Sequence, residues 1–321
     1  HCQCRRQRQM CIRDRVITTI TAPTTLSGNL GGNVDVSLSS STGYDSSTMG
    51  AVTYTIKDQG NVTGASISGS DLDLLDLSSA TITPAAASAT IEIQATIAAN
   101  DQYAGTTTTY NVTVNRASAN ISGFVLSDPP TVTASNGSYT NSIAPTITPP
   151  ASYIGGIEYG DYVFTVSSNN TGATLNTSTG EASGATSAGT INVQVTTAGG
   201  TKYDSFAVGA YSIEFVRESI NITPPTALSG NLGGNVNVSL SSSNGYNLAM
   251  GAVTYTIKDQ GNVTGASISG SDLDLLDLSS ATITPAAASA TIEIQATTQA
   301  NGYYAGTTTT YNVTVNRANN P

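Results

Sequence analysis

Cysteine, histidine, tryptophan and charged residues are scarce in this sequence. Its 321 residues include 3 cysteines, 1 histidine and no tryptophan, and only 10% of them are charged. All the cysteines and the histidine lie in the first fifteen residues, so no disulfide can join segments of the remaining chain. The same absence removes the cysteine nucleophiles and histidine bases that most hydrolytic triads need.

Basic residues and long apolar runs are also missing. From residue 16 onward, six basic residues stand against twenty acidic ones. A nucleic-acid partner is therefore not expected, because phosphate binding depends on clustered Lys and Arg. No apolar run approaches the roughly 18 to 20 residues that a membrane span requires. We expect neither nucleic-acid binding nor membrane insertion.

The first fifteen residues (HCQCRRQRQMCIRDR) differ in composition from everything that follows. They resemble a translated sequencing adapter, and we expect residues 1–15 to be a non-native tail outside the fold. A basic tail is one alternative, and a metal site built from His1, Cys2, Cys4 and Cys11 is another. The cysteine spacing, C-x-C-x6-C, lacks the paired C-x2-C of zinc sites.

An internal duplication organises the rest of the chain. Met49–Thr96 recurs without a change as Met250–Thr297, about 200 residues later. A diverged copy lies between the two, since Ile191–Thr196 (INVQVT) parallels Ile91–Thr96 (IEIQAT). The repeating unit is therefore about 100 residues, the length of a β-sandwich domain. We expect three modules: module 1 (16–118), module 2 (119–218, the diverged copy) and module 3 (219–321, the near-copy of module 1).

Apolar and polar residues alternate with a period of two inside each module. This pattern is typical of antiparallel strands with one buried and one solvent-facing side. No segment of ten or more residues has a helical apolar stripe, and Pro84–Ser88 is expected to be a loop or single turn. The sequence therefore predicts an all-β fold, three tandem immunoglobulin-like β-sandwiches in an extended array. The buried positions expected in module 1 are Val34, Val36, Leu38, Val52, Tyr54, Ile56, Ala89, Ile91, Ile93, Ala95, Tyr110, Val112 and Val114.

Three segments carry a resemblance to a known family. They are residues 163–184 (VFTVSSNNTGATLNTSTGEASG), the strand TINVQV that follows, and the ending YNVTVNRA. Together they resemble the bacterial Ig-like, cadherin-like modules that repeat in large surface adhesins, and the resemblance covers nearly all of residues 16–321. It implies a β-sandwich fold and a role as a stalk or adhesive array. It transfers no binding residues, because these modules have no common ligand site.

The densest group of oxygen ligands is the motif SDLDLLD, which occurs in modules 1 and 3. Calcium takes six to eight oxygen ligands, and closely spaced carboxylates in a loop supply some of them. The motif lacks the Asp or Asn and the Gly that an EF-hand has at its fifth and sixth positions. The alternative is a short strand with Leu72 and Leu74 buried and two of the aspartates in solvent. The candidate calcium ligands are Asp71, Asp73, Asp76, Asp272, Asp274 and Asp277.

Tyrosine is the abundant aromatic residue, with 15 tyrosines against 4 phenylalanines. Tyr103, Tyr303 and Tyr304 lie in Gly- and Asn-rich loops, where exposed rings stack on sugars or anchor protein contacts. The alternative is that Tyr103, Tyr203 and Tyr304 close the ends of the core, because the three modules share this position. Tyr303 has no such reason, since module 1 has Gln102 at that place.

These observations favour a non-enzymatic, extracellular structural or adhesive segment that acts as a stalk or spacer at a cell surface. Neighbouring Ig-like modules of the same longer chain are the expected partners, and no cofactor is expected apart from the calcium considered above. Two alternatives remain open. The modules themselves bind a glycan or a cell-surface protein through their loop ends, or the chain belongs to a phage or virus tail fibre.

Overall fold

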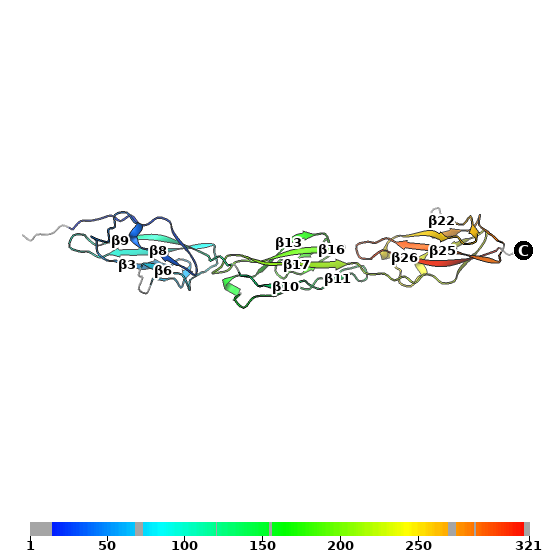
Figure 1. Cartoon of the computed structure of the whole chain (residues 1–321), viewed down its shortest axis with the longest axis horizontal. Coiled ribbons are helices and arrows are strands. Elements are labelled where there is room, and N and C mark those ends of the chain that lie inside the picture. Colours follow the sequence, from blue (N-terminus) through cyan, green and yellow to red (C-terminus); the bar gives the residue numbers. More distant parts are fainter. Residues whose placement is uncertain are drawn as a thin grey trace, which may run out of the picture. The chain divides into compact units, whose positions relative to one another are not determined.

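The computed structural model describes residues 15–67, 73–119, 121–153, 156–268, 274–285 and 287–317. Strands dominate these residues, and their helical elements are one-turn 3-10 segments: Leu38–Ser40, Gly156–Glu158, Leu240–Ser242 and Leu248–Met250. The prediction of an all-β chain built from tandem immunoglobulin-like β-sandwiches is confirmed (Figure 1). The residue boundaries between the modules stay a prediction.

By the density of its internal contacts the described chain divides into two compact units. Unit 1 comprises the residues up to Val125 together with Thr148–Val163 and Val195–Gly209. Unit 2 comprises Leu126–Ile147, Phe164–Gln194 and the residues from Ala210 onward. Unit 1 therefore holds module 1 with part of module 2, and unit 2 holds the rest of module 2 with module 3.

A long hairpin forms the centre of the larger sheet of module 1. Its strands β8 and β9 pair antiparallel over their full length. The outer strand β3 pairs antiparallel with β8, and β1 pairs parallel with β9. The bounds in this sheet are β1 (Leu26–Asn29), β3 (Val52–Asp58), β8 (Ser88–Ile97) and β9 (Thr106–Asn115). Shorter strands complete the sandwich, β2 (Asn33–Asp35), β5 (Ser66–Ile67) and β6 (Leu74–Asp76) in one sheet and β4 (Val62–Thr63) with β7 (Thr81–Ile82) in another.

Module 3 repeats this arrangement strand for strand, as its near-identical sequence requires. Its larger sheet has the order β18-β26-β25-β20, and β18 again pairs parallel with the last strand. The bounds are β18 (Leu228–Asn231), β19 (Asn235–Asn237), β20 (Val253–Asp259), β21 (Val263–Thr264), β22 (Ser267–Ile268), β23 (Leu275–Asp277), β24 (Thr282–Ile283), β25 (Ser289–Thr298) and β26 (Thr307–Asn316).

Module 2 keeps the larger sheet although its sequence has diverged. The order β11-β17-β16-β13 matches that of the other two modules, with a parallel pair at one edge. The bounds are β10 (Val125–Ser127), β11 (Val132–Thr133), β12 (Thr146–Thr148), β13 (Tyr162–Asn169), β14 (Thr174–Leu175), β15 (Ala182–Ser183), β16 (Gly189–Thr197) and β17 (Ala207–Val216). The strand order of the larger sheet is the same in the three modules, and the assignment of this segment as a diverged copy stays a prediction.

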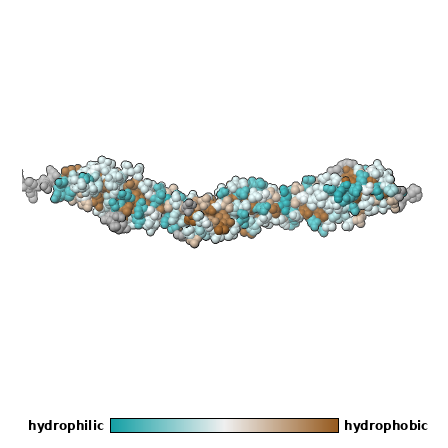
Figure 2. Space-filling model, viewed as in Figure 1, coloured by the Kyte–Doolittle hydropathy of each residue, from teal (hydrophilic) through white to brown (hydrophobic). Residues whose placement is uncertain are grey.

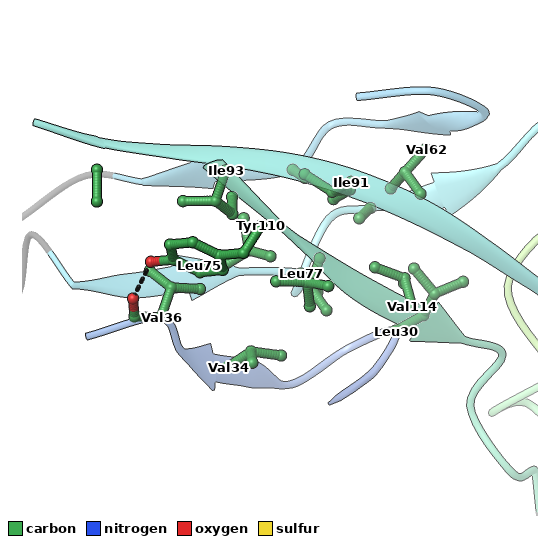
Figure 3. Packing of buried hydrophobic residues seen from close by; sticks show 14 of the residues in the cluster. Leu30, Val34, Val36, Val62, Leu75, Leu77, Ile91, Ile93, Tyr110 and Val114 are labelled. Carbon is green, nitrogen blue, oxygen red and sulfur yellow. Dashed lines mark hydrogen bonds between the residues drawn. The ribbon is translucent and has the colours of Figure 1, made fainter. Parts of the chain in front are cut away.

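The buried side of the β8–β9 hairpin forms the core of module 1. Ile91 and Ile93 on β8 and Val114 on β9 are fully buried, as their alternation predicts. They pack with Leu75 and Leu77 from the β6 segment (Figure 3). Burying each such aliphatic side chain contributes about 1.5–3 kcal/mol, so the hairpin supplies much of the favourable free energy of the domain.

A tyrosine hydroxyl ties the hairpin to the rest of the sandwich. Tyr110 on β9 is 7% exposed and donates a hydrogen bond to the backbone carbonyl of Val36 (Figure 3). Tyr311 donates in the same way to the carbonyl of Val238. Val36 and Val238 are fully buried, and the tyrosines supply their carbonyls with a hydrogen-bond donor. Module 2 has the same device, since Tyr211 donates to the carbonyl of Gly180 at 2.6 Å.

Two local expectations need correction. The strand through Val34 and Val36 ends at Asp35, and Leu38 opens a 3-10 turn. The cause is the Asp35 carboxylate, which accepts the Ser37 N–H at 2.8 Å and turns the chain. All three predicted apolar side chains are nevertheless buried.

The second correction concerns the phase of β6. The expectation that Leu74 is buried is wrong, because Leu75 and Leu77 are the fully buried leucines. Leu75 lies opposite Val34 on β2 and Ile67 on β5, and this pairing sets which side of β6 faces the core. Leu72 lies outside the described residues.

Removing both hydroxyls, in the double variant Tyr110→Phe with Tyr311→Phe, tests the tyrosine hydrogen bond. We expect the free energy of unfolding of each affected module to fall by about 1–3 kcal/mol, because a buried carbonyl loses its donor. Urea unfolding at pH 7, followed by circular dichroism, measures the change. The control is Tyr44→Phe, whose ring packs only partly buried against the same core. Equal effects of the two variants would contradict this role.

Alkaline pH provides a second test of the same tyrosines. Burial raises the pKa of Tyr110 and Tyr311 above the ordinary value of 10.0. Above about pH 10 the unfolded chain ionises these hydroxyls while the folded chain keeps them neutral, so stability falls as pH rises. Thermal unfolding measured from about pH 8 to about pH 11, a range that includes the pKa of free tyrosine at about 10, should show this loss. The double phenylalanine variant should lose less stability over that range.

Candidate functional site

Each module holds the segment that leads into it against its own tyrosine loop. The loop joins the last two strands of the module, and one residue of the incoming segment forms an isolated parallel β-bridge with the loop tyrosine. The bridged pairs are Val16 with Tyr103, Ala117 with Tyr203, and Glu218 with Tyr304. Because this β-bridge recurs in all three modules, it is a property of the fold.

The junction between modules 1 and 2 lies within unit 1. Strand β9 ends at Asn115, and a single residue, Arg116, separates it from Ala117. The N–H of Ala117 donates to the carbonyl of Lys202 at 2.9 Å, and the N–H of Asp204 donates to Ala117 at 3.0 Å. The linker is one residue long and is followed at once by two backbone hydrogen bonds. The chain therefore has little conformational freedom at the junction.

A further hydrogen bond and a ring stack support this junction. Ile82 of β7 donates its N–H to the carbonyl of Thr201 at 2.8 Å. Tyr203 stacks on Tyr159 with ring centroids 4.3 Å apart and planes inclined by 7°. Burial, followed by the hydroxyl contact with Tyr203, raises the pKa of Tyr159 to about 12. The tyrosine loop of module 2 is therefore held from both sides.

The junction between modules 2 and 3 lies within unit 2 and follows the same plan. Glu218 donates its N–H to the carbonyl of Tyr303 at 2.8 Å, and Ala305 donates to Glu218 at 2.9 Å. The Glu218 carboxylate also accepts the N–H of Asn136 at 2.9 Å. Arg217, the single residue between strand and bridge, donates from Nε to the carbonyl of Asn301 at 2.5 Å. Side chains therefore reinforce the backbone bonds at this junction.

Tyr303 packs inside the second junction. Its ring lies 5.5 Å from that of Tyr139, and the Tyr139 hydroxyl donates to the carbonyl of Gly302 at 2.8 Å. Burial raises the pKa of Tyr139 above its ordinary value of 10.0, so this hydroxyl stays a donor into the alkaline range. Gly302 is required here, because a Cβ at this position would lie 2.2 Å from the carbonyl oxygen of Thr186.

The three tyrosines expected to contact a ligand therefore have defined places. Tyr304 is 2% exposed, and Tyr103 and Tyr303 are half-buried. The alternative reading, in which the shared tyrosine closes the end of the core, fits Tyr304 best. As ligand contacts the three residues stay a prediction. Sequence reasoning missed Tyr139 and Gly302, although the change from Asp101 in module 1 to Gly302 in module 3 was a visible signal.

The structure describes only four of the six predicted calcium ligands, since Asp71 and Asp272 lie outside the described residues. Asp76 accepts the N–H of Ser78 at 2.8 Å, and hydrogen bonds from that serine lower the pKa of Asp76. Asp277 has the same arrangement in module 3. Within the part of the chain that the structure describes, no three His, Cys, Asp or Glu side chains are grouped to hold a metal ion. Calcium binding stays a prediction.

Two glutamates on the larger sheets of modules 1 and 3 form ion pairs at the surface. Glu92 forms an ion pair with Lys57 at 2.9 Å, and Glu293 pairs with Lys258 at the same distance. The paired side chains are between 30% and 49% exposed, and such surface pairs contribute little to stability.

Among the described residues, no helix has the length and apolar character needed to cross a lipid bilayer.

Comparison with known proteins finds likeness at the level of structure. No family model and no curated protein matches the sequence. The fold is similar to Drosophila N-cadherin EC1-3, with 12% identity over 93% of this chain and 99% of that chain and a TM-score of 0.37. It is also similar to mouse cadherin-23 EC22-24, with 14% identity over 94% of this chain and 99% of that chain and a TM-score of 0.27. The resemblance to bacterial adhesin modules stays a prediction.

Grafting the module 1 loop onto module 3, as Gly302→Asp with Tyr303→Gln, tests the second junction. We expect the amides of Glu218 and Ala305 to exchange on the order of tenfold faster, because a Cβ at position 302 displaces the loop and weakens bonds of about 1 kcal/mol each. Hydrogen exchange by NMR measures this.

The matched control is the reverse change in module 1, Asp101→Gly with Gln102→Tyr, which should leave those two amides unaffected. Unchanged exchange in the module 3 graft would show that the loop sequence does not hold the junction.

Proposed function

We propose that the chain is an extracellular, non-enzymatic structural segment that spaces or presents a binding domain at a cell surface. The observation that carries this proposal is the single-residue linker at each junction, anchored by backbone hydrogen bonds to the next module. Spacer segments need modules that transmit orientation, and a short bonded linker does so better than a flexible one.

The places where the chain enters and leaves a module support the same role. In module 1, Ile97 pairs with Thr106 beside the tyrosine loop, whereas Ser88 pairs with Asn115 at the other end of the hairpin. The incoming segment is bound at the loop, and the outgoing segment leaves after Asn115. A ten-residue strand spans about 33 Å. Module 3 has the same register, so the chain is carried from one end of each of these domains to the other.

Surface composition agrees with an exposed structural role. The molecular surface in Figure 2 is mostly weakly polar, and hydrophobic residues form only small patches on the face shown. Large exposed hydrophobic side chains among the described residues are scattered along the chain, as Ile17, Ile143, Ile157 and Leu248 illustrate. Scattered apolar residues of this kind do not form the broad patch that an obligate protein interface presents.

A flexible insertion between strand β17 and the linker to module 3 tests the proposal. Inserting Gly-Ser-Gly-Ser between Val216 and Arg217 leaves the bonded bridge of Glu218 intact but separates it from β17. Spin labels at Thr165→Cys and Thr256→Cys, both exposed and both in unit 2, report the distance between modules 2 and 3 once Cys2, Cys4 and Cys11 are changed to Ser. We expect a narrow distance distribution that the insertion broadens.

The control places the same insertion between Ser178 and Thr179, in an exposed turn of module 2. It should leave the distribution narrow. A native distribution as broad as that of the linker insertion would overturn the spacer role, because the short linker would then impose no orientation.

A further inference from the structure

Module 2 has an open groove on the outward side of its larger sheet, and all of its lining residues belong to unit 2. Strands β13, β16 and β17, labelled in Figure 1, supply most of it. Its volume is about 400 Å³, which falls in the range of about 300–1,000 Å³ typical of small-ligand sites. The lining residues are Asp128, Ser167, Asn192, Gln194, Ala210, Tyr211 and Ser212.

Beside the groove, module 2 has no counterpart of an ion pair that its neighbours have. In module 1, Lys57 on β3 and Glu92 on β8 bridge the outward side of the sheet at 2.9 Å. The aligned positions in module 2 are Ser167 and Asn192, as the segments YTIK and FTVS and the segments IEIQ and INVQ show. Two long charged side chains are thereby replaced by short neutral ones, and space opens over the strands.

Hydrogen bonds hold the shortened side chains in place. Ser167 donates from its hydroxyl to the carbonyl of Asn192 at 3.0 Å, and the Asn192 amide donates to the Ser168 hydroxyl at 2.7 Å. Asp128, which follows β10, accepts the N–H of Ser212 at 2.8 Å and is thereby fixed at the groove. Gln194 is exposed on β16, two residues beyond Asn192.

The chemistry of this lining selects a class of ligand. Carboxylate, carboxamide and hydroxyl groups offer both donors and acceptors at close spacing, which suits a ligand rich in hydroxyl groups. The Asp128 carboxylate forms stronger hydrogen bonds with hydroxyl donors than a neutral acceptor does. Among the described residues that line the groove there is no Lys or Arg, so an anionic ligand would meet the negative charge of Asp128 without a compensating cation.

We propose that this groove is a binding site for a neutral carbohydrate, contacted by Asp128, Asn192 and Gln194. The site is separate from the loop ends, and it is confined to module 2, since modules 1 and 3 keep the ion pair at the corresponding positions. It does not depend on the spacer role, and either proposal can fail without the other.

Titration of the whole chain, labelled with 15N, against neutral mono- and disaccharides tests the site. The probes are glucose, galactose, mannose, N-acetylglucosamine and lactose, each up to about 10 mM, because shallow polar sites bind in the millimolar range. We expect at least one sugar to shift the amide resonances of Asn192 and Ser212. N-acetylneuraminic acid, which is anionic, should bind at least about tenfold more weakly, as expected from its repulsion by Asp128.

Two variants locate the binding. Ser167→Lys with Asn192→Glu rebuilds the ion pair of modules 1 and 3, and we expect it to abolish the shift of Ser212. Asp128→Asn keeps an acceptor for the Ser212 N–H but removes the charge, and binding should weaken about fivefold to tenfold. The matched control, Thr177→Lys with Ser178→Glu, adds the same charges at exposed turn positions outside the groove and should bind as the native chain does.

Four outcomes would overturn the proposal. They are no shift of Asn192 or Ser212 with any neutral sugar, native binding by the variant with the rebuilt ion pair, native binding by Asp128→Asn, and equal or tighter binding of the anionic sugar. The amide spectrum of each variant shows directly whether module 2 remains folded, and Asp128→Asn tests the site even if the double variant does not fold.

Discussion

The antiparallel hairpin of the last two strands is the element on which the rest of each module depends. One side of it is buried, and this side carries the tyrosine whose hydroxyl must find an acceptor inside the sandwich. In module 1 that acceptor is the carbonyl of Val36, so the hairpin and the opposite layer are joined by a directed bond as well as by apolar packing. The loop at one end of the same hairpin binds the incoming linker, and the strand leaving the other end becomes the outgoing linker. The same hairpin therefore supplies the buried core strands, the loop that binds the incoming linker and the strand that leads into the outgoing linker.

The core and the linker contacts use different parts of this hairpin, and near-identical modules can therefore differ at their junctions. Modules 1 and 3 share their cores, and a change there would cost stability in a closely packed interior. Their tyrosine loops are free to vary because the side chains lie at the end of the hairpin. Gly302 and Tyr303 replace Asp101 and Gln102, and both replacements are used at the junction with module 2. The same reasoning applies to the outward face of the sheet, where module 2 exchanged an ion pair for short polar side chains without disturbing Ile191 and Val193 beneath them.

Sequence patterns predicted the strands well and their limits less well. The alternation through Ile91 and Ile93 places residues on the correct faces, because the period of two is a property of any extended strand. Local pattern was insufficient around Leu74, where a run of apolar residues fits either phase. Pairing with Val34 and Ile67 on neighbouring strands chose the phase that buries Leu75. The candidate ligand residues were less predictable still, since the exposure of a loop tyrosine depends on how the preceding module and the segment that leads into the loop's own module pack against it.

By itself the sequence determined the β class, the repeat of about 100 residues, the diverged middle copy and the buried side of the long strands. These follow from periodicity and self-similarity, which are local or one-dimensional properties. Only the tertiary structure decided that Glu218 pairs with Tyr304, that Tyr139 packs against Tyr303, and that Asp128 accepts the N–H of Ser212. Each of these contacts joins residues more than 60 positions apart, and no rule of local pattern determines which distant segments meet, because that choice is made by the packing of whole sheets and by the hydrogen bonds of the chain between them.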